Sequence, residues 1–329
     1  MQNFEYSAAT NRPELPDGGA FIAGGTDLLQ LMKSNVAAPA AIVDLAPQNL
    51  RFIHANETEL RLGALETMAN VAAHPDVQRN WPAISQALLL SASPQVRNMG
   101  TMGGNLLQRT RCLYFRDASF PCNKRNPGSG CPAIAGENRE LAILGGSDHS
   151  LATHPSDFPV ALMALGARLS IVAANGQTRT VPLAEFYRLP GNTPEIETVL
   201  QHGDVIHEII VPASAAARNS GYVKVRDRTS FAFALVSAAV SLEQRDGKIH
   251  AATIALGGVA PMPWRAGKAE QALQGATPHE AAFDQAARLA TDGARSAGMN
   301  DFKIALAQRA VKRALEQVTS PESSNGGTL

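Results

Sequence analysis

The stretch Phe21-Ile22-Ala23-Gly24-Gly25-Thr26-Asp27-Leu28 joins a short apolar run to two glycines and a helix-forming run that continues to Lys33. This order predicts a strand over 21–23, a tight turn and a helix over 28–33, with Thr26 or Asp27 as the N-cap. Adjacent glycines let a backbone approach a ligand closely, and a helix start offers free N–H groups to a phosphate. A plain strand-to-helix turn has the same pattern, so both interpretations stay open at this point.

Two further polar turns follow along the chain. Asn98-Met99-Gly100-Thr101-Met102-Gly103-Gly104-Asn105 combines three glycines with small polar residues and suits a backbone wrapped around a pyrophosphate. Its spacing is not G-x-G-x-x-G and no strand precedes it, which disfavours a Rossmann fold. Thr153-His154-Pro155-Ser156-Asp157 opens a helix predicted over 157–165, where Ser156 or Asp157 would act as an N-cap.

Composition excludes several classes of protein. The chain has 329 residues, of which 45% are hydrophobic, and its 29 basic residues balance its 29 acidic residues. An ordinary apolar fraction without net charge argues against disorder, and a neutral surface argues against general nucleic-acid binding. The sequence lacks an apolar run of the ~18 residues that a membrane span needs, and its N-terminus lacks the layout of a signal peptide. The length predicts about two domains.

The cysteines form one cluster in the sequence. Cys112, Cys122 and Cys131 are separated by nine and eight residues, without the short C-x2-C pairs of zinc modules. Thiolates suit iron–sulfur clusters, but a four-iron cluster normally takes four ligands, and the nearest candidates downstream are His149 and Ser150. Three unligated thiols are the alternative.

The surrounding segment 97–139, predicted to be a long loop, has seven basic residues against two acidic ones, which predicts an anionic neighbour. The basic residues are Arg97, Arg109, Arg111, Arg116, Lys124, Arg125 and Arg139.

The rest of the sequence has mixed α and β character. Lys224 and Arg226 alternate along a predicted strand, which places them on one face, where they could hold a flavin edge or phosphates. A solvated edge strand is the alternative. Asp246-Gly247 predicts a hairpin turn. The remaining predictions are strands at 41–45, 60–64, 168–173 and 249–259, helices at 83–92 and through most of 264–318, and a connector over 190–212.

Taken in order, the three glycine and polar turns resemble the flavin-binding subunit of the xanthine dehydrogenase family of molybdenum hydroxylases. The segments Asn105–Cys112, Pro121–Arg125 and Pro127–Cys131 resemble the branch of bacterial aldehyde oxidoreductases, whose FAD subunit has an additional [4Fe–4S] cluster in an inserted loop. The resemblance implies an α+β fold: a two-lobed FAD-binding domain of the vanillyl-alcohol-oxidase type over 1–215, with an insertion at about 106–150. A C-terminal domain with an antiparallel sheet and helices would follow over 216–320, and 321–329 would be a disordered tail.

The resemblance also assigns residues to the cofactors. FAD would contact Ala23, Gly24, Gly25, Thr26, Asp27, Leu28, Asn98, Gly100, Thr101, Gly103, Gly104, Asn105, Ser156, Asp157, Lys224 and Arg226. Cys112, Cys122 and Cys131 would be iron ligands. Where that branch has a fourth cysteine, this sequence has Ser150, so the fourth ligand would be Ser150 or the adjacent His149. A labile cluster, a three-iron cluster and no cluster at all remain the alternatives.

By the same resemblance, the chain would act in a heterotrimer. Its partners would be a molybdopterin-binding large subunit and a [2Fe–2S] small subunit, and electrons would pass from the molybdenum site through the clusters to FAD and an external acceptor. Such a complex would be cytoplasmic, or periplasmic by export with a partner that has a signal sequence. Two other functions remain possible from the sequence: a self-contained flavin oxidase, and a non-catalytic module with a structural metal site.

Overall fold

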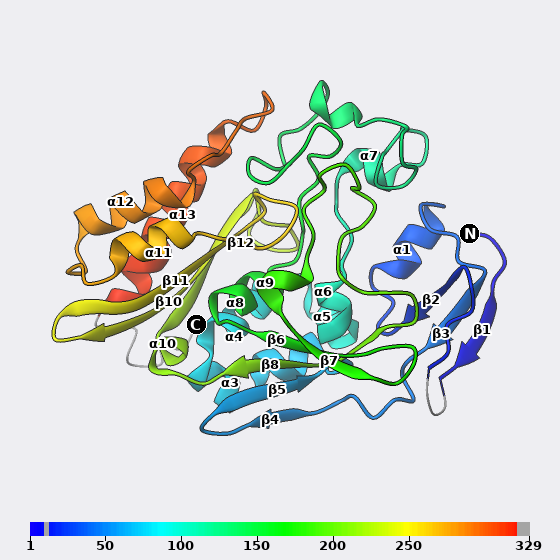
Figure 1. The fold of residues 1–329 in the computed structure, drawn as a ribbon, viewed down its shortest axis with the longest axis horizontal. Coiled ribbons are helices and arrows are strands. Elements are labelled where there is room, and N and C mark those ends of the chain that lie inside the picture. Colours follow the sequence, from blue (N-terminus) through cyan, green and yellow to red (C-terminus); the bar gives the residue numbers. More distant parts are fainter. Residues whose placement is uncertain (10–12, 321–329) are drawn as a thin grey trace.

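The computed structural model describes residues 1–9 and 13–320; the predicted tail at 321–329 lies outside the described residues. Three separate sheets organise the chain (Figure 1). Two belong to the N-terminal two-thirds of the sequence, and the third belongs to the C-terminal part together with three helices. The fold is therefore α+β, with the predicted two lobes followed by an antiparallel sheet-and-helix domain.

The first lobe is a small parallel sheet in the order β1-β3-β2. Its strands are β1 (Glu5–Ala8), β2 (Gly19–Ile22) and β3 (Ala41–Asp44), and α1 (Leu28–Lys33) connects β2 to β3. Parallel neighbours need a crossover of this kind, because a tight hairpin can join only antiparallel strands. The strand, turn and helix predicted from the opening motif are all present.

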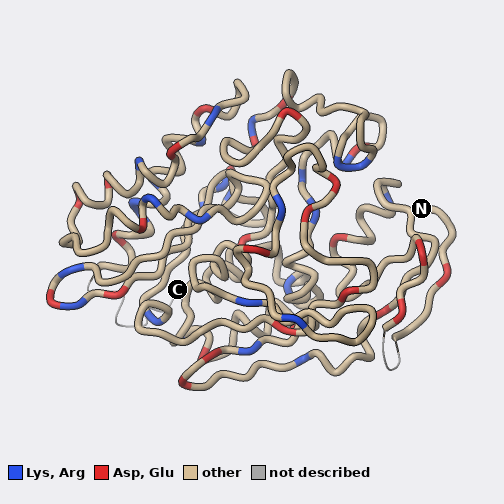
Figure 2. The backbone as a smooth tube through the Cα atoms, viewed as in Figure 1, with Lys and Arg blue, Asp and Glu red and all other residues tan. Residues whose placement is uncertain are grey.

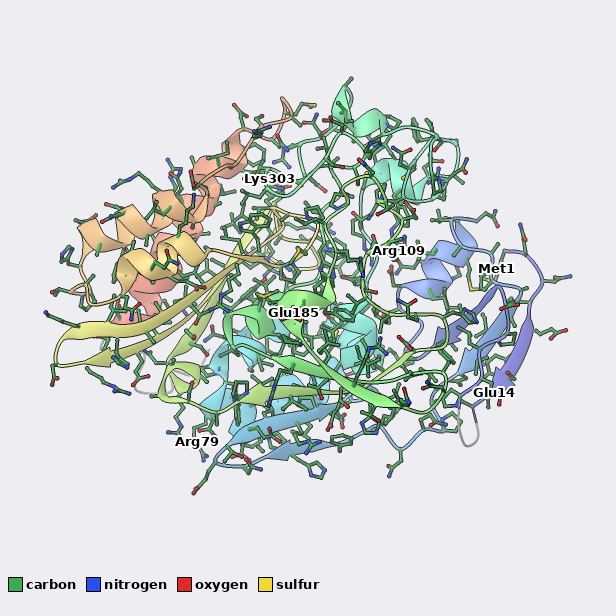
Figure 3. The ribbon with its side chains drawn as sticks, viewed as in Figure 1. Met1, Glu14, Arg79, Arg109, Glu185 and Lys303 are labelled. Atoms are coloured by element: carbon green, nitrogen blue, oxygen red, sulfur yellow. The ribbon has the colours of Figure 1, made fainter. Side chains whose placement is uncertain are left out.

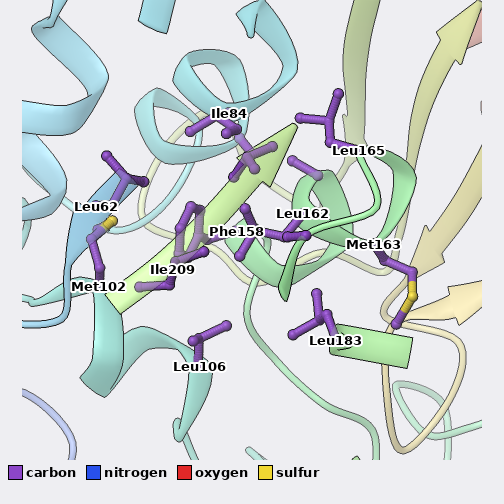
Figure 4. Packing of buried hydrophobic residues seen from close by; sticks show 14 of the residues in the cluster. Leu62, Ile84, Met102, Leu106, Phe158, Leu162, Met163, Leu165, Leu183 and Ile209 are labelled. Atoms are coloured by element: carbon purple, nitrogen blue, oxygen red, sulfur yellow. The ribbon is translucent and has the colours of Figure 1, made fainter. Parts of the chain in front are cut away.

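The second lobe is an antiparallel sheet in the order β4-β5-β8-β6-β7. Its strands are β4 (Ile53–Ala55), β5 (Glu59–Gly63), β8 (Val205–Pro212), β6 (Arg168–Val172) and β7 (Thr178–Pro182). Helices pack on it through a shared core in which Phe158, Leu62 and Ile209 meet (Figure 4). These helices include α2 (Met68–Ala73), α3 (Pro75–Asn80), α4 (Pro82–Leu89), α6 (Met102–Leu106), α8 (Phe158–Ala164) and α9 (Leu183–Phe186).

The prediction of a connector over 190–212 was wrong for its second half. Residues Val205–Pro212 form β8, the middle strand of this sheet. Residues on both faces of this strand are buried, so it has no polar–apolar alternation, and His207 and Glu208 interrupt its apolar residues, so it is not a continuous apolar run either. Pro212 stands at the end of β8, where a residue without an N–H does not interrupt the ladder.

The C-terminal domain is an antiparallel sheet in the order β12-β11-β10-β9, covered by helices with their own buried core. The predicted hairpin turn is present: Asp246 and Gly247 both have positive φ, at 51° and 72°, as a two-residue type I′ turn requires. The strands are β9 (Ser220–Val225), β10 (Val236–Arg245), β11 (Lys248–Gly257) and β12 (Trp264–Arg265). The helices are α11 (Gly267–Leu273), α12 (Glu280–Ala290) and α13 (Phe302–Thr319), and α10 (Ala215–Arg218) precedes β9.

The predicted long loop at 97–139 is only partly irregular. Its first part contains α5 (Pro94–Met99) and α6, which are capped by the hydroxyls of Ser93 and Thr101. Pro94 begins α5, since proline is well suited to the first helical turn. We call residues 106–150 the cysteine segment. After the end of α6 at Leu106, it contains only α7 (Leu113–Arg116) and a 3-10 turn at Pro132–Ile134.

A buried lysine attaches the cysteine segment to the C-terminal domain (Figure 3). The Lys303 ammonium, at the start of α13, donates to the carbonyl oxygens of Glu140, Leu141 and Gly258 at 2.9, 2.9 and 2.6 Å. The Lys303 side chain is fully buried, so these three acceptors replace its lost water.

Among the described residues, no helix is both long and apolar enough to cross a lipid bilayer.

Candidate functional site

A cavity of about 580 Å³ lies between the glycine turns, the Ser156–Asp157 turn and β9. It contains residues of both N-terminal lobes, of the C-terminal sheet and of the loop that leads from β9 to β10. Nine of the predicted FAD contacts line it: Thr26, Asp27, Gly100, Thr101, Gly104, Asn105, Ser156, Asp157 and Lys224. Seven others are not part of its lining: Ala23, Gly24, Gly25, Leu28, Asn98, Gly103 and Arg226.

Gly24 supports the cavity without lining it. A Cβ built on Gly24 would lie 1.9 Å from the Met99 carbonyl oxygen and 2.8 Å from the Met99 carbonyl carbon. Only a residue without a side chain lets the first turn pack directly on the second. Gly103 has a related role, because its Cβ would lie 3.1 Å from the Ala64 Cβ. The two glycine motifs, about 75 residues apart in sequence, therefore form one wall.

Asp157 accepts three side-chain hydrogen bonds in the cavity. Its carboxylate accepts from Ser91 Oγ at 2.7 Å, Tyr222 Oη at 2.5 Å and Lys224 Nζ at 2.7 Å. Asp157 was predicted as an N-cap and a cofactor contact, but its side chain does not cap α8. Burial and the neighbouring carboxylate raise the pKa of Tyr222 well above its ordinary value, so the phenol stays protonated and donates. An ionised carboxylate has about four acceptor positions, which leaves room for one ligand hydroxyl.

Ser91 and Tyr222 were absent from the sequence prediction. Tyr222 lies two residues before Lys224 on β9, and residues two apart share a face of a strand, so this signal was available. Ser91 has no comparable signal, since it follows the end of α4 and meets Asp157 only through the tertiary fold.

Arg226 does not line the cavity. It donates to the Leu90 carbonyl oxygen at 2.9 Å, and Lys224 donates to the same oxygen at 3.1 Å.

His154 connects the second motif to the third. Its Nδ1 accepts from the Ser156 backbone N–H at 3.3 Å, and its Nε2 lies 3.3 Å from the Leu106 carbonyl oxygen. The only arrangement that satisfies both contacts has a proton on Nε2 and none on Nδ1. Burial lowers the pKa of His154 to about 4, so the ring is neutral at physiological pH. Ser156 also donates through its hydroxyl to Asn105 Oδ1, which joins the same two turns.

Asp27 joins the first glycine turn to the cysteine segment. Its Oδ2 accepts from the Arg109 backbone N–H at 2.8 Å, and its Oδ1 lies 2.8 Å from Arg116 and 3.1 Å from Arg111. Although Asp27 occupies the N-cap position of α1, its side chain makes no capping bond. A residue predicted from local sequence to cap a helix is instead held by partners more than 80 positions away.

Acidic residues from other parts of the chain pair with several basic residues of the cysteine segment, and acidic and basic positions are interspersed over the fold (Figure 2). Glu197 lies 2.5 Å from Arg109 and 2.7 Å from Lys124. Arg139 pairs with Asp227 at 3.0 Å. Glu197 and Asp27 therefore each pair with two basic residues of the segment.

The three cysteines belong to one small buried core together with Phe115 and Leu141. Burial raises the pKa of the Cys112 and Cys131 thiols, and nearby backbone N–H groups oppose that effect. For Cys112 these belong to Tyr114 and Phe115, and for Cys131 to Ala133, Ile134 and Leu151. Within residues 1–9 and 13–320, no group of three or more His, Cys, Asp and Glu side chains has the spacing to hold a metal ion.

Two protein families match the chain, in the order of its two domains. Residues 8–214 match the FAD binding domain in molybdopterin dehydrogenase, and residues 220–318 match the CO dehydrogenase flavoprotein C-terminal domain. The chain belongs to the molybdopterin dehydrogenase FAD-binding family. It is an oxidoreductase subunit of the wider xanthine dehydrogenase family, as its sequence motifs indicated.

Named relatives within this family cover almost the whole chain. The aldehyde oxidoreductase FAD-binding subunit PaoB of Escherichia coli is 44% identical, over 96% of each chain. The carbon monoxide dehydrogenase medium chain of Hydrogenophaga pseudoflava is 28% identical, over 95% of this chain and 96% of its own. A solved structure of that dehydrogenase superposes with a TM-score of 0.74 over 96% of each chain. Quinoline 2-oxidoreductase from Pseudomonas putida 86 superposes with a TM-score of 0.71 at 25% identity, over 96% of this chain and 97% of its own.

The cavity of this FAD-binding family member fits the cofactor chemically. Gly24 and Gly103 keep side chains out of the wall that the two turns share. Hydroxyl, amide and carboxylate groups along the lining can bind sugar and ribityl hydroxyls, and Arg111 and Lys224 supply positive charge. A ligand site that is large, concave and lined by a few convergent polar groups is typical of a cofactor pocket.

Proposed function

We propose that this chain is the FAD- and [4Fe–4S]-carrying electron-transfer subunit of a heterotrimeric molybdenum-dependent aldehyde oxidoreductase. Its partners would be a molybdopterin-binding large subunit and a [2Fe–2S] small subunit. The chain receives electrons that originate at the molybdenum site and passes them to an external acceptor. Bound FAD supplies the redox chemistry, while the protein supplies orientation and electrostatics. We further propose that residues 1–215, with an insertion at 106–150, and residues 216–320 are its two units.

The observation that supports this proposal is the direct attachment of the cysteine segment to the flavin turn. Asp27 lies in the wall of the cavity, accepts hydrogen bonds from Arg109 and Arg116, and pairs with Arg111, so its partners lie on either side of Cys112. A cluster bound by this segment would therefore lie beside the flavin site. The similarity to the aldehyde oxidoreductase subunit of Escherichia coli over nearly the full length supports the aldehyde class of reaction.

The surroundings of the thiols suit a cluster with negative charge. Three cysteine thiols share one buried core, and backbone N–H groups point toward the sulfur atoms of Cys112 and Cys131. Such donors and nearby positive charge tune the reduction potential of iron–sulfur clusters. The excess positive charge around Asp27 and Glu197 acts in the same direction.

For the fourth ligand we propose Ser150 over His149. Ser150 is buried and belongs to the inner side of the segment, whereas His149 is exposed. The N–H of the next residue, Leu151, points toward the Cys131 sulfur. The His149 backbone carbonyl is also held by the Asn123 amide at 3.1 Å, which fixes this stretch of chain relative to Cys122.

The test is metal and flavin analysis of the full-length chain prepared without oxygen. We expect FAD absorption together with a broad band that dithionite bleaches, and iron that falls in Cys122→Ser. Ser150→Cys should hold iron at least as well as the wild type, and Ser150→Ala should lose it. Ser119→Ala, in an exposed serine of the same segment, is the matched control. An iron-to-flavin ratio near zero in the wild type would exclude the cluster.

The flavin and the partners have separate tests. A colourless chain would contradict the whole proposal and favour a structural module. Co-purification should recover the two partner subunits, and aldehyde turnover should require them. Complete aldehyde oxidation by this chain alone would show a self-contained enzyme instead of an electron-transfer subunit.

A further inference from the structure

Arg111 reaches the flavin cavity from the cysteine segment. It immediately precedes Cys112 in the sequence, and its side chain lines the cavity. Three contacts hold the guanidinium in place. It lies 3.1 Å from Asp27 Oδ1, donates to Gln30 Oε1 at 3.0 Å, and stacks with its Cζ 4.7 Å from the centre of the Phe233 ring.

One donor of Arg111 is unused in this arrangement. Its Nε–H is buried and has no hydrogen-bond acceptor among the described residues. Leaving a buried donor of a charged group unpaired costs more than leaving a neutral one, so such groups usually have a partner in the working protein. A ligand in the cavity can provide that acceptor.

The local charge favours an anionic acceptor. Asp27 pairs with both Arg111 and Arg116, and one carboxylate cannot cancel the charge of two guanidinium groups at this end of the cavity. Two other carboxylates line the cavity: Asp227 pairs with Arg139 at 3.0 Å, and Glu140 interacts electrostatically with Arg139 and Lys303. Burial lowers the pKa of Arg111 to about 10, which leaves it fully protonated at neutral pH.

The other cations of the cavity are already occupied. Lys224, whose side chain is 1% exposed, is bound to Asp157 and to the Leu90 carbonyl oxygen. Arg228 donates to the carbonyl oxygen of Phe231 and is exposed. Among the described residues that line the cavity, Arg111 is therefore the cation with a buried donor that has no acceptor.

We propose that Arg111 binds the diphosphate of the bound dinucleotide, so that the cysteine segment forms part of the flavin site. Guanidinium groups present planar, paired donors that match phosphate oxygens. This inference rests on the proposed FAD-carrying function and adds a residue of the inserted segment to the binding machinery. It also gives a physical connection between the cysteines and the flavin, because movement of Cys112 moves the adjacent Arg111.

The experiment compares FAD with riboflavin, which has the same ring and ribityl chain but lacks the diphosphate. The full-length chain, freed of flavin, is titrated with each compound while flavin fluorescence is followed. For Arg111→Gln we expect FAD to bind at least about tenfold more weakly, the loss expected for one charged hydrogen bond, while riboflavin binding is unchanged. Arg79→Gln, in an arginine whose side chain is 73% exposed, is the matched control and should change neither.

Riboflavin binding also reports whether the variant has folded with an intact cavity. Equal FAD affinity in Arg111→Gln and the wild type would overturn the inference. An equal loss for FAD and riboflavin would also overturn it, since Arg111 would then act only by holding Asp27. Failure of the wild-type chain to bind FAD would instead refute the proposed function, so the two failures are distinguishable.

Discussion

Replacing Gly24 by alanine tests whether contact between the two glycine turns shapes the cavity. The added Cβ would lie 1.9 Å from the Met99 carbonyl oxygen and 2.8 Å from the adjacent carbon, both of which are backbone atoms. Because no side chain can rotate away, the turns must separate. Overpacking of this kind costs about 3 kcal/mol, which in a domain of this size lowers Tm by roughly 6–12 °C.

The assay is thermal unfolding together with FAD content, measured on Gly24→Ala and on Gly267→Ala. Gly267 begins α11, and a Cβ there meets nothing within 4 Å, so alanine should be neutral or slightly stabilising. We expect Gly24→Ala to lose both stability and bound FAD, because separation of the turns opens the wall of the cavity. Equal Tm and equal FAD content in the two variants would refute the reasoning.

Two other predictions concern buried polar groups. Lys224→Met should destabilise the chain by about 3–5 kcal/mol in urea unfolding, because it leaves the buried Asp157 carboxylate without its cation. Lys268→Met, which breaks an exposed pair with Asp292, should cost less than about 1 kcal/mol. Similar costs for the two variants would contradict the role of Lys224 as the cation that stabilises the buried Asp157 carboxylate. The folded-state pKa of His154 is depressed from 6.5 to about 4, so the unfolded chain binds more protons between these values and stability falls as pH falls through this window. His154→Gln should remove up to roughly 3 kcal/mol of that pH dependence. If the free energy of unfolding of the variant falls between pH 6.5 and 4 as steeply as that of the wild type, another group is responsible.

Local patterns predicted many of the elements, because apolar periodicity and turn residues act within a few positions, but they did not predict the short strands β1, β4 and β7. The helix at 28–33 has the predicted bounds, and the hairpin turn lies at Asp246-Gly247 as predicted. The strand β8 was predicted to be a connector, because a strand that is buried on both faces shows no alternation of polar and apolar residues. Sequence order also favoured Asp27 and Asp157 as helix caps. The fold gives both carboxylates to distant cations instead, at Arg116 and Lys224.

The cavity itself was predictable only in part. Motif residues such as Thr101 and Ser156 line it, and their identification depended on a family resemblance as well as on local sequence. Ser91 and Arg111 meet the site through contacts between segments that lie far apart in the chain, and no spacing rule brings them together. The basic character of the cysteine segment was visible, but its acidic partners Asp27 and Glu197 became evident only in three dimensions.

A crystal structure of the full-length chain grown with FAD is the most direct test of the flavin site. The account predicts FAD density between the first glycine turn and Asp157, with the diphosphate beside Arg111. Density for FAD anywhere else, or a cavity closed by side chains in crystals that contain the flavin, would contradict it.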